Sequence, residues 1–279
     1  MTPYIKVLRI KHWVKNLFLF AAPFFGGNLF SNEILLIAFP SFIAFSLSAS
    51  AVYVYNDIKD IEGDKLHPKK KRRPIASNAI SKRNAYMFSV VLVVISLIIS
   101  FRIATAFFYF IVMYLLIQMI YSMYLKNVAI VDIFCIASGF VIRVLAGGAA
   151  FHIDVSKWLL LTMFMISLVL AAGKRLGEVS LLNEKVEEHR RSLNVYSIST
   201  LNEILLISSA AALIAYALYT VEQFHRLVYT IPIVTFGLFR YLMLSKQGIG
   251  DPTETITRDK WLALTVGLWL LVVGLIRYH

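Results

Sequence analysis

Three aspartates and an adjacent asparagine, Asn56, Asp57, Asp60 and Asp64, are the first residues whose types and spacing suggest chemistry. If one helix runs through them, the aspartates lie at positions i, i+3 and i+7 and share a face. Carboxylates gathered in this way repel one another unless a cation neutralises them. Mg²⁺ prefers one or two carboxylates together with substrate phosphates, so the four residues are candidate metal ligands and the aspartates are candidate catalytic residues. The alternative is a solvated acidic turn that pairs with nearby lysines.

A strongly basic segment rich in Lys, Arg and Pro follows the acidic motif directly. Arginine binds phosphate through forked hydrogen bonds, and lysine binds it as a point charge. His67, Lys70 and Arg73 are therefore candidate substrate-binding residues. A simpler interpretation is a topology determinant that contacts anionic lipid headgroups. Nucleic acid is not an expected partner, because no aromatic-studded recognition module accompanies the basic run.

Charged residues inside apolar stretches are functional candidates because they are costly at the centre of a bilayer. Asp132 and Arg143 are eleven residues apart, about 16 Å along a helix, so they share a face but each needs another partner. A ligand or ribose contact is one interpretation for Asp132. For Arg143, structural pairing with a carbonyl or a glutamate is an equal alternative to substrate binding. The remaining candidate substrate-binding residues are Lys15, Lys174, Arg175 and Glu178.

These residues must be positioned by membrane-spanning elements. Of the 279 residues, 59% are hydrophobic and 16% charged, whereas soluble domains are about 45–50% apolar and about 25% charged. The lone Cys135 excludes an intramolecular disulfide framework. Nine apolar stretches are long enough to cross a bilayer. They are 13–31, 34–55, 84–101, 104–124, 129–151, 158–172, 204–220, 227–244 and 261–278.

Two of these stretches are irregular. The first is interrupted by Pro23 and by Gly26 and Gly27, and the sixth is short unless its helix continues into residues 173–180. With the N-terminus in the cytoplasm, 22 of the 28 basic residues fall on the cytoplasmic side, four outside and two within spans. We therefore expect an all-α membrane protein of nine transmembrane helices, with the N-terminus cytoplasmic, the C-terminus outside and residues 1–279 forming one integral-membrane domain.

The motif from Asn56 to Asp64, Asn-Asp-x-x-Asp-x-x-x-Asp, resembles the first aspartate motif of the UbiA-type polyprenyl transferase superfamily. More narrowly, the chain is similar to its bacterial decaprenyl-phosphate phosphoribosyltransferase branch. That likeness rests on further segments spread over nearly the whole chain, which are 11–16, 64–76, 121–148, 173–178 and, more weakly, 251–259. The resemblance implies a UbiA-like bundle of nine helices that uses Mg²⁺ and a diphosphate-bearing donor.

One departure from the wider superfamily narrows the expected reaction. Aromatic prenyl transferases of this fold carry a second aspartate-rich motif after the sixth span, where this chain has Lys174 and Arg175. Cations at that place fit an anionic acceptor such as a polyprenyl phosphate. The resemblance thus implies transfer of a 5-phosphoribosyl group from phosphoribosyl diphosphate to that lipid, in cell-wall biosynthesis. The site would face the cytoplasm at the inner membrane. In that reaction Lys174 and Arg175 would hold a substrate phosphate, and Glu178 would orient them.

Other functions fit parts of the same pattern. A Mg²⁺-dependent prenyl transferase acting on an aromatic acceptor such as 4-hydroxybenzoate is the main alternative, disfavoured by the missing second aspartate motif. A related enzyme could transfer another phosphosugar. A transporter would need broken helices in matching halves and a midplane site, whereas the polar residues here gather at one membrane face. Membrane lipids are expected partners, and the sequence leaves a homo-oligomer open.

Overall fold

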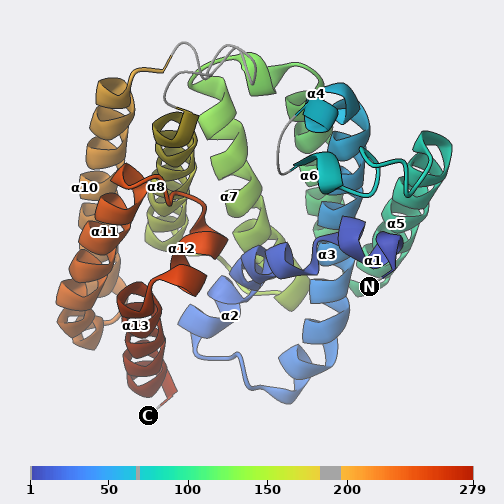
Figure 1. Ribbon diagram of the computed structural model, residues 1–279. Helices are drawn as coiled ribbons and strands as arrows, with labels where there is room; N and C mark the ends of the chain where they lie inside the picture. Colours follow the sequence, from blue (N-terminus) through green and yellow to red (C-terminus); the bar gives the residue numbers. More distant parts are fainter. Residues whose placement is uncertain (1, 67–69, 183–195, 279) are drawn as a thin grey trace.

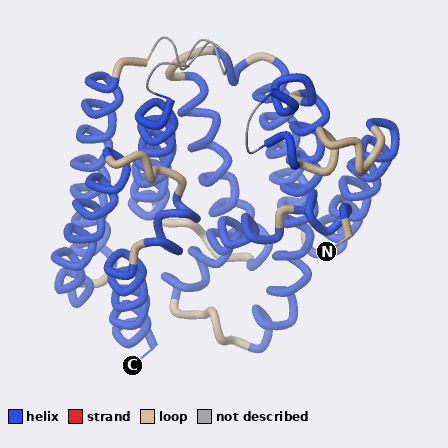
Figure 2. The backbone as a smooth tube through the Cα atoms, in the orientation of Figure 1, coloured by secondary structure: helices blue, strands red, loops and turns tan. Residues whose placement is uncertain are grey.

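The computed structural model describes residues 2–66, 70–182 and 196–278, and within these ranges it contains helices and loops but no strand (Figures 1 and 2). The long α-helices are α3 (Asn32–Lys59), α5 (Lys82–Ile103), α6 (Thr105–Met123), α7 (Val131–Phe151), α8 (Lys157–Leu182), α10 (Ile198–Gln223), α11 (Ile231–Lys246) and α13 (Lys260–Tyr278). The short α-helices are α1 (Pro3–Leu8), α2 (Ala21–Gly26), α4 (Ile61–Leu66) and α12 (Pro252–Arg258). The 3-10 helices are η1 (Ile10–Phe20), η2 (Lys70–Arg72), η3 (Leu125–Asn127) and η5 (His225–Thr230).

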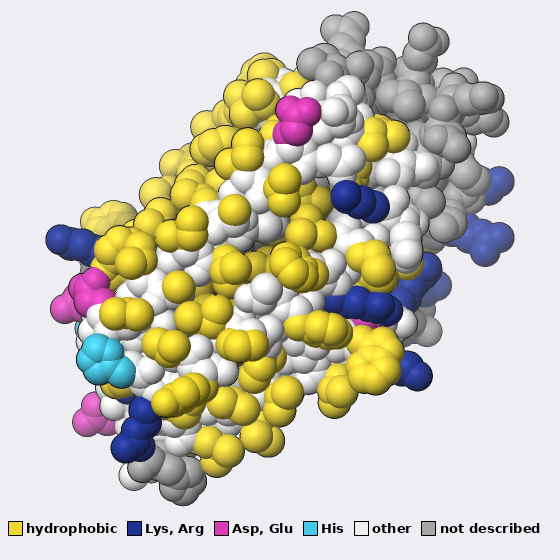
Figure 3. Space-filling view, turned by 90° about the vertical axis from the view of Figure 1, so that its left-hand side faces the viewer, with side chains coloured by type: hydrophobic (Ala, Val, Ile, Leu, Met, Phe, Trp, Pro, Cys, Tyr) yellow, Lys and Arg dark blue, Asp and Glu magenta, His cyan; other side chains and the backbone are white. Residues whose placement is uncertain are grey.

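Among the described residues, eight helices are long and apolar enough to cross a membrane. Their outward faces carry large apolar side chains; Ile207, Phe239 and Leu264, for example, are each more than 60% exposed. Figure 3 shows one such face, with hydrophobic side chains across its breadth and most charged ones toward its margins. Exposed apolar surface on this scale is stable in lipid rather than in water. The chain is therefore a multi-pass membrane protein.

The predicted ninth span, residues 13–31, does not form a continuous helix. It is divided between η1 and α2, and α2 ends where Gly27 adopts φ 77°. Pro23 and this left-handed glycine interrupt the helical hydrogen bonding. The expectation of nine spans is therefore not confirmed, and the sidedness of the two termini remains a prediction.

The other predicted spans all correspond to observed helices, some of them longer than expected. The sixth continues through residues 173–180, because α8 extends from Lys157 to Leu182. α8 packs most extensively against α10 and α7, and α3 packs against α5. Small residues let η1 approach α7 closely: a Cβ added to Gly147 would lie 2.6 Å from the carbonyl carbon of Leu19. Close helix packing through a small residue is thus observed at Gly147.

The aspartate motif does not lie on one continuous helix, which corrects the expected i, i+3, i+7 face. α3 ends at Lys59, Asp60 caps it outside helical geometry, and α4 then begins at Ile61. α4 lies beside the ends of α3 and α6 at the top of Figure 1. This break separates the three carboxylates into two groups that have different partners.

Candidate active site

A cavity of about 470 Å³ opens among α3, α4, α6, α7 and α8. Ten of the thirteen predicted site residues line it: Lys15, Asn56, Asp57, Asp60, Asp64, Lys70, Arg73, Arg143, Lys174 and Glu178. The other three are not in its wall. Asp132 and Arg175 are fully buried beside it, and His67 lies outside the described residues.

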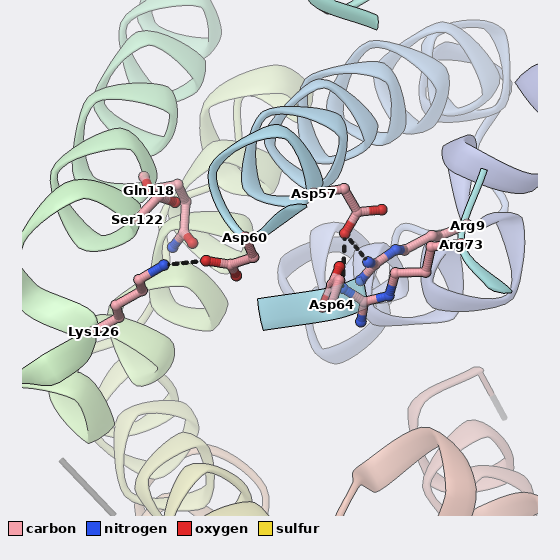
Figure 4. A network of polar contacts seen from close by, with 8 residues as sticks. All are labelled: Arg9, Asp57, Asp60, Asp64, Arg73, Gln118, Ser122 and Lys126. Atoms are coloured by element: carbon pink, nitrogen blue, oxygen red, sulfur yellow. Dashed lines mark hydrogen bonds and ion pairs between the residues drawn. The ribbon is translucent and has the colours of Figure 1, made fainter. Parts of the chain in front are cut away.

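At one end of the cavity, Asp57 and Asp64 converge on a single cationic atom (Figure 4). Nη1 of Arg73 lies 2.9 Å from Oδ1 of Asp57 and 2.7 Å from Oδ2 of Asp64. Arg9 also donates a hydrogen bond to Asp57. Both carboxylates are buried, at 3% and 4% exposure, so a cation is required to keep them charged there.

Asp60 belongs to a separate group. Its carboxylate pairs with Lys126 of η3 and turns toward α6, away from Asp57 and Asp64 (Figure 4). The described residues contain no cluster of three or more His, Cys, Asp or Glu side chains close enough to hold one metal ion. The residues that do converge are two aspartates, with Asn56 also in the cavity wall.

Another part of the cavity wall is basic, and it contains Lys15, Lys174 and Arg143. Nζ of Lys15 lies 3.4 Å from Oδ2 of Asp251, the residue that caps α12. Burial lowers the pKa of Lys15, although Asp251 acts in the other direction. Burial also tends to raise the pKa of Asp251, but Lys15 and Lys174 outweigh it and hold that pKa at about 2. Asp251 is therefore an ionised counter-ion for the lysine side of the cavity.

Arg175 and Asp132 form a buried ion pair instead of contacting the cavity. Nε of Arg175 lies 2.5 Å from Oδ2 of Asp132, and both side chains are at most 1% exposed. The same guanidinium holds two residues that do line the cavity, with Nη1 bound to Glu178 and Nη2 lying 3.0 Å from the Tyr121 hydroxyl. Arg175 thus positions cavity residues from behind.

Several cavity residues carry no signal that singles them out in the sequence. Arg9 is one of several N-terminal basic residues and Tyr121 is one of 14 tyrosines, yet both line the cavity. Gln118 and Tyr114 of α6 also line the cavity, although the sequence of α6 is that of an ordinary apolar span. Asp251 shows only a weak motif likeness. Arg240, a charged residue within an apolar stretch, pairs with Asp259 at 2.6 Å.

The fold and this cavity define a helical membrane protein whose charged site lies among the ends of its spanning helices. A family model described as the UbiA prenyltransferase family matches residues 17–248. The chain belongs to the UbiA prenyltransferase family, and it is a transferase.

Relatives and solved structures extend this similarity over the whole chain. The chain is 35% identical to a decaprenyl-phosphate phosphoribosyltransferase of Mycobacterium tuberculosis, over 97% of this chain and 92% of that protein. It is 33% identical to the protein of the same name from Corynebacterium glutamicum, over 98% and 86% of the two chains. A UbiA homologue from Archaeoglobus fulgidus, solved with GPP and Mg²⁺ bound, matches the fold with a TM-score of 0.74. Its sequence is 18% identical, and the match covers 99% of both chains.

Proposed function

We propose that this protein transfers the 5-phosphoribosyl group of phosphoribosyl diphosphate to a polyprenyl phosphate and releases diphosphate. The reaction would use Mg²⁺ at the cytoplasmic face of the inner membrane. The observation that carries the proposal is that one cavity contains both a converging pair of aspartates, Asp57 and Asp64, and a group of cations, Lys15, Lys174 and Arg143. Two phosphate-bearing substrates need both a metal-binding side and a cationic side. The names of the mycobacterial and corynebacterial relatives agree with this pair of substrates.

The acidic side fits a magnesium ion. Asp57 and Asp64 already place two carboxylate oxygens within 3 Å of one cationic atom of Arg73, and Mg²⁺ is commonly held by one or two carboxylates plus substrate phosphates. Asp57 and Asp64 would hold the ion with Asn56, which also lines the cavity, as a further oxygen donor; Asp60 would join them only on leaving its pair with Lys126. A bound Mg²⁺ would bind the donor diphosphate and neutralise the charge that grows on it as it leaves.

The chain's own cations would share that task. Arg73 and Arg9 contact Asp57, and Lys70 lines the same side of the cavity. When the bond from the anomeric carbon to the diphosphate oxygen lengthens, negative charge accumulates on the diphosphate and positive charge on the ribose ring. Arginine and lysine side chains fixed beside the leaving group stabilise this separation, and such preorganised charge is usually the largest catalytic contribution.

The acceptor needs no general base. A phosphate monoester carries its second negative charge near neutral pH, so one of its oxygens can attack the anomeric carbon directly. The new carbon–oxygen bond forms as the bond to diphosphate breaks, and the electron pair of that bond leaves with the diphosphate. No proton has to be moved, in keeping with a site built from carboxylates and cations.

The test combines purified protein, Mg²⁺, labelled phosphoribosyl diphosphate and a polyprenyl phosphate. We expect a lipid-linked phosphoribose and one diphosphate per turnover, with no product when either substrate is omitted. Prenylation of 4-hydroxybenzoate from a prenyl diphosphate, together with no lipid-linked phosphoribose, would overturn the proposal in favour of an aromatic prenyl transferase.

A further inference from the structure

Arg143 is a buried cation with neutral partners only. It lies within α7, is 5% exposed, and has no carboxylate at ion-pair distance in the part of the chain that the structure describes. Its Nε donates to Oδ1 of Asn16 at 2.8 Å, its Nη1 to the Gly139 carbonyl at 2.5 Å, and its Nη2 to the Tyr114 hydroxyl at 3.2 Å. An uncompensated charge in such a place is costly.

The guanidinium also retains hydrogen-bonding capacity. Arginine has five N–H donors, and the three acceptors of Arg143 leave one donor on each terminal nitrogen. A remaining donor on each terminal nitrogen can bind an oxygen of a phosphate. Because Arg143 lines the cavity together with Gly139, and Gly139 has no side chain to cover it, an anion in the cavity can reach the guanidinium.

Arg175 provides an internal comparison. It is also buried, but Asp132 and Glu178 both bind it, and it does not line the cavity. The chain therefore supplies carboxylates to the buried arginine that faces the core and only neutral groups to the one that faces the cavity. From this difference we expect that an anionic group of a substrate binds beside Arg143.

The other cations on this side of the cavity leave the same charge imbalance. Lys15 and Lys174 face the cavity with Arg143, while Asp251 is the carboxylate at ion-pair distance from Lys15. Glu178 lies one helical turn beyond Lys174 and is bound by Arg175. The carboxylates beside Lys15 and Lys174 are thus those of Asp251 and Glu178, and Arg175 also binds Glu178. The positive charge in this part of the cavity therefore exceeds the negative charge. A phosphate dianion would complete the balance.

Depth and polarity indicate which phosphate it is. Asp60, at the end of α3, contacts Lys126 near the start of α7, so the acidic side lies at that end of the helix. Arg143 lies twelve residues, or about three helical turns, into α7 from that end, so it is deeper in the bundle. The rings of Phe45, Tyr114 and Phe140 surround its guanidinium at 5.1–5.4 Å. Tyr114 and Phe140 also line the cavity, and such aromatic surface suits the first isoprene units of a lipid better than the hydroxyls of a ribose.

We propose that Arg143, with Lys15 and Lys174, binds the phosphate of the polyprenyl acceptor, while the donor diphosphate binds at Asp57 and Asp64. This assignment rests on the proposed function and adds to it which side of the cavity receives which substrate. Asn16 is a positioning residue that holds the guanidinium through its amide oxygen. Its neutrality matters, because a carboxylate there would replace the substrate as counter-ion.

The sharpest test is Asn16→Asp, which keeps the shape and gives Arg143 an internal counter-ion. We expect the KM for a polyprenyl phosphate to rise about tenfold or more, with the KM for phosphoribosyl diphosphate near the wild-type value. The melting temperature should not fall, since the buried charge gains a partner. Ser46→Ala is the matched control: it removes the hydrogen bond from Asn16 to Ser46, 2.9 Å long, without a change of charge, and should leave both KM values unchanged.

Direct binding separates this inference from the proposed function. Labelled farnesyl phosphate in detergent micelles is the probe, and farnesol, which lacks the phosphate, is the control ligand. Asn16→Asp and Arg143→Met should weaken farnesyl phosphate binding about tenfold or more, and Arg143→Lys less so, because it keeps the charge but loses the fork. Farnesol binding should be the same in all variants.

Each contrary outcome has a distinct meaning. If the wild-type protein and Asn16→Asp bind farnesyl phosphate equally well, the role of Arg143 is overturned. The proposed function then still stands. A rise in the KM for phosphoribosyl diphosphate alone would assign Arg143 to the donor and also overturn the inference. Failure of the wild-type protein to bind farnesyl phosphate would contradict the acceptor in the proposed function itself.

Discussion

Asp57 carries the acidic side of the cavity, because it contacts two arginines from separate parts of the chain. Arg9 reaches it from the junction of α1 and η1, and Arg73 reaches it from beyond η2. At 3% exposure the carboxylate has little access to water, so its charge depends on these partners or on a metal ion that replaces them. The residue therefore links the fold of the N-terminus to the proposed donor site.

Asp57→Asn should lower kcat/KM by about a hundredfold or more, because it removes a proposed metal ligand and the partner of two leaving-group cations. Turnover of labelled phosphoribosyl diphosphate measures this. Glu62→Gln is the control, since Glu62 is 86% exposed and pairs with Lys65; it should behave as wild type. Retained activity in Asp57→Asn would remove the metal-site argument.

His12 makes the stability of the protein depend on pH. Burial and the charge of Lys15 lower the pKa of His12 from 6.5 to about 4, and its buried Nδ1 has no hydrogen-bond partner among the described residues. Between these two values the unfolded chain binds a proton that the folded chain does not. Stability is therefore full above pH 6.5 and falls as the pH decreases toward 4.

His12→Gln should flatten this dependence, because glutamine does not titrate. The melting temperature of detergent-solubilised protein, followed from about pH 7 down to about pH 5, should decrease less in the variant than in wild type. Equal slopes in the two proteins would show that His12 is not the group responsible.

At the scale of elements, two adjacent residues of α8 lie in different places, one in the cavity wall and the other in the core. Lys174 faces the cavity, whereas Arg175 points into the core toward Asp132 of α7. Successive residues of a helix point about 100° apart, so neighbouring cations can hold different positions. The two residues read alike in the sequence, and packing against α7 decides which of them meets a substrate.

Removing one partner of the buried pair should destabilise the fold. Arg175→Met leaves Asp132 charged and buried, and we expect the free energy of unfolding to fall by about 3–5 kcal/mol. A lower melting temperature in detergent would report it. Arg258→Met is the control, because Arg258 is 62% exposed in its pair with Glu254 and exposed pairs contribute little. Equal losses in the two variants would contradict the assignment.

A glycine contact between α8 and the loop before α12 positions Asp251. A Cβ added to Gly177 would lie 2.7 Å from the backbone nitrogen of Gly250, so Gly177→Ala should push this loop away from α8. We expect a lower melting temperature, because the added methyl group forces apart a close backbone contact. Gly267→Ala, with nothing within 4 Å of the added Cβ, is the control and should be neutral or slightly stabilising. Unchanged properties in Gly177→Ala would show that the contact is not required.

For the whole molecule, the acidic side of the cavity has protein cations as well as a proposed metal. Because Arg9 and Arg73 already neutralise Asp57 and Asp64, the fold should not depend on Mg²⁺. Chelation with EDTA should abolish turnover and leave the melting temperature nearly unchanged, and added Mg²⁺ should restore activity. A large fall in melting temperature on chelation would instead assign the metal a structural role.

The sequence by itself determined the membrane class, the position of eight long helices and the two charged segments beside them. Those features depend on local properties: apolar runs of sufficient length, and charge that cannot be placed in hydrocarbon. The motif likeness also indicated the family, because it compares residue types and spacing and needs no coordinates. The same comparison of residue types and spacing helped to select the thirteen candidate site residues, ten of which line the cavity.

Only the tertiary structure decided how these charges pair. A helical spacing rule placed Asp57, Asp60 and Asp64 on one face, but the chain breaks after Lys59 and sends Asp60 to Lys126. Partners such as Arg9 for Asp57 are dozens of residues distant in sequence. Ion pairing in a low-dielectric interior depends on separations of a few ångströms, and those separations are set by how helices pack, not by the order of residues along them.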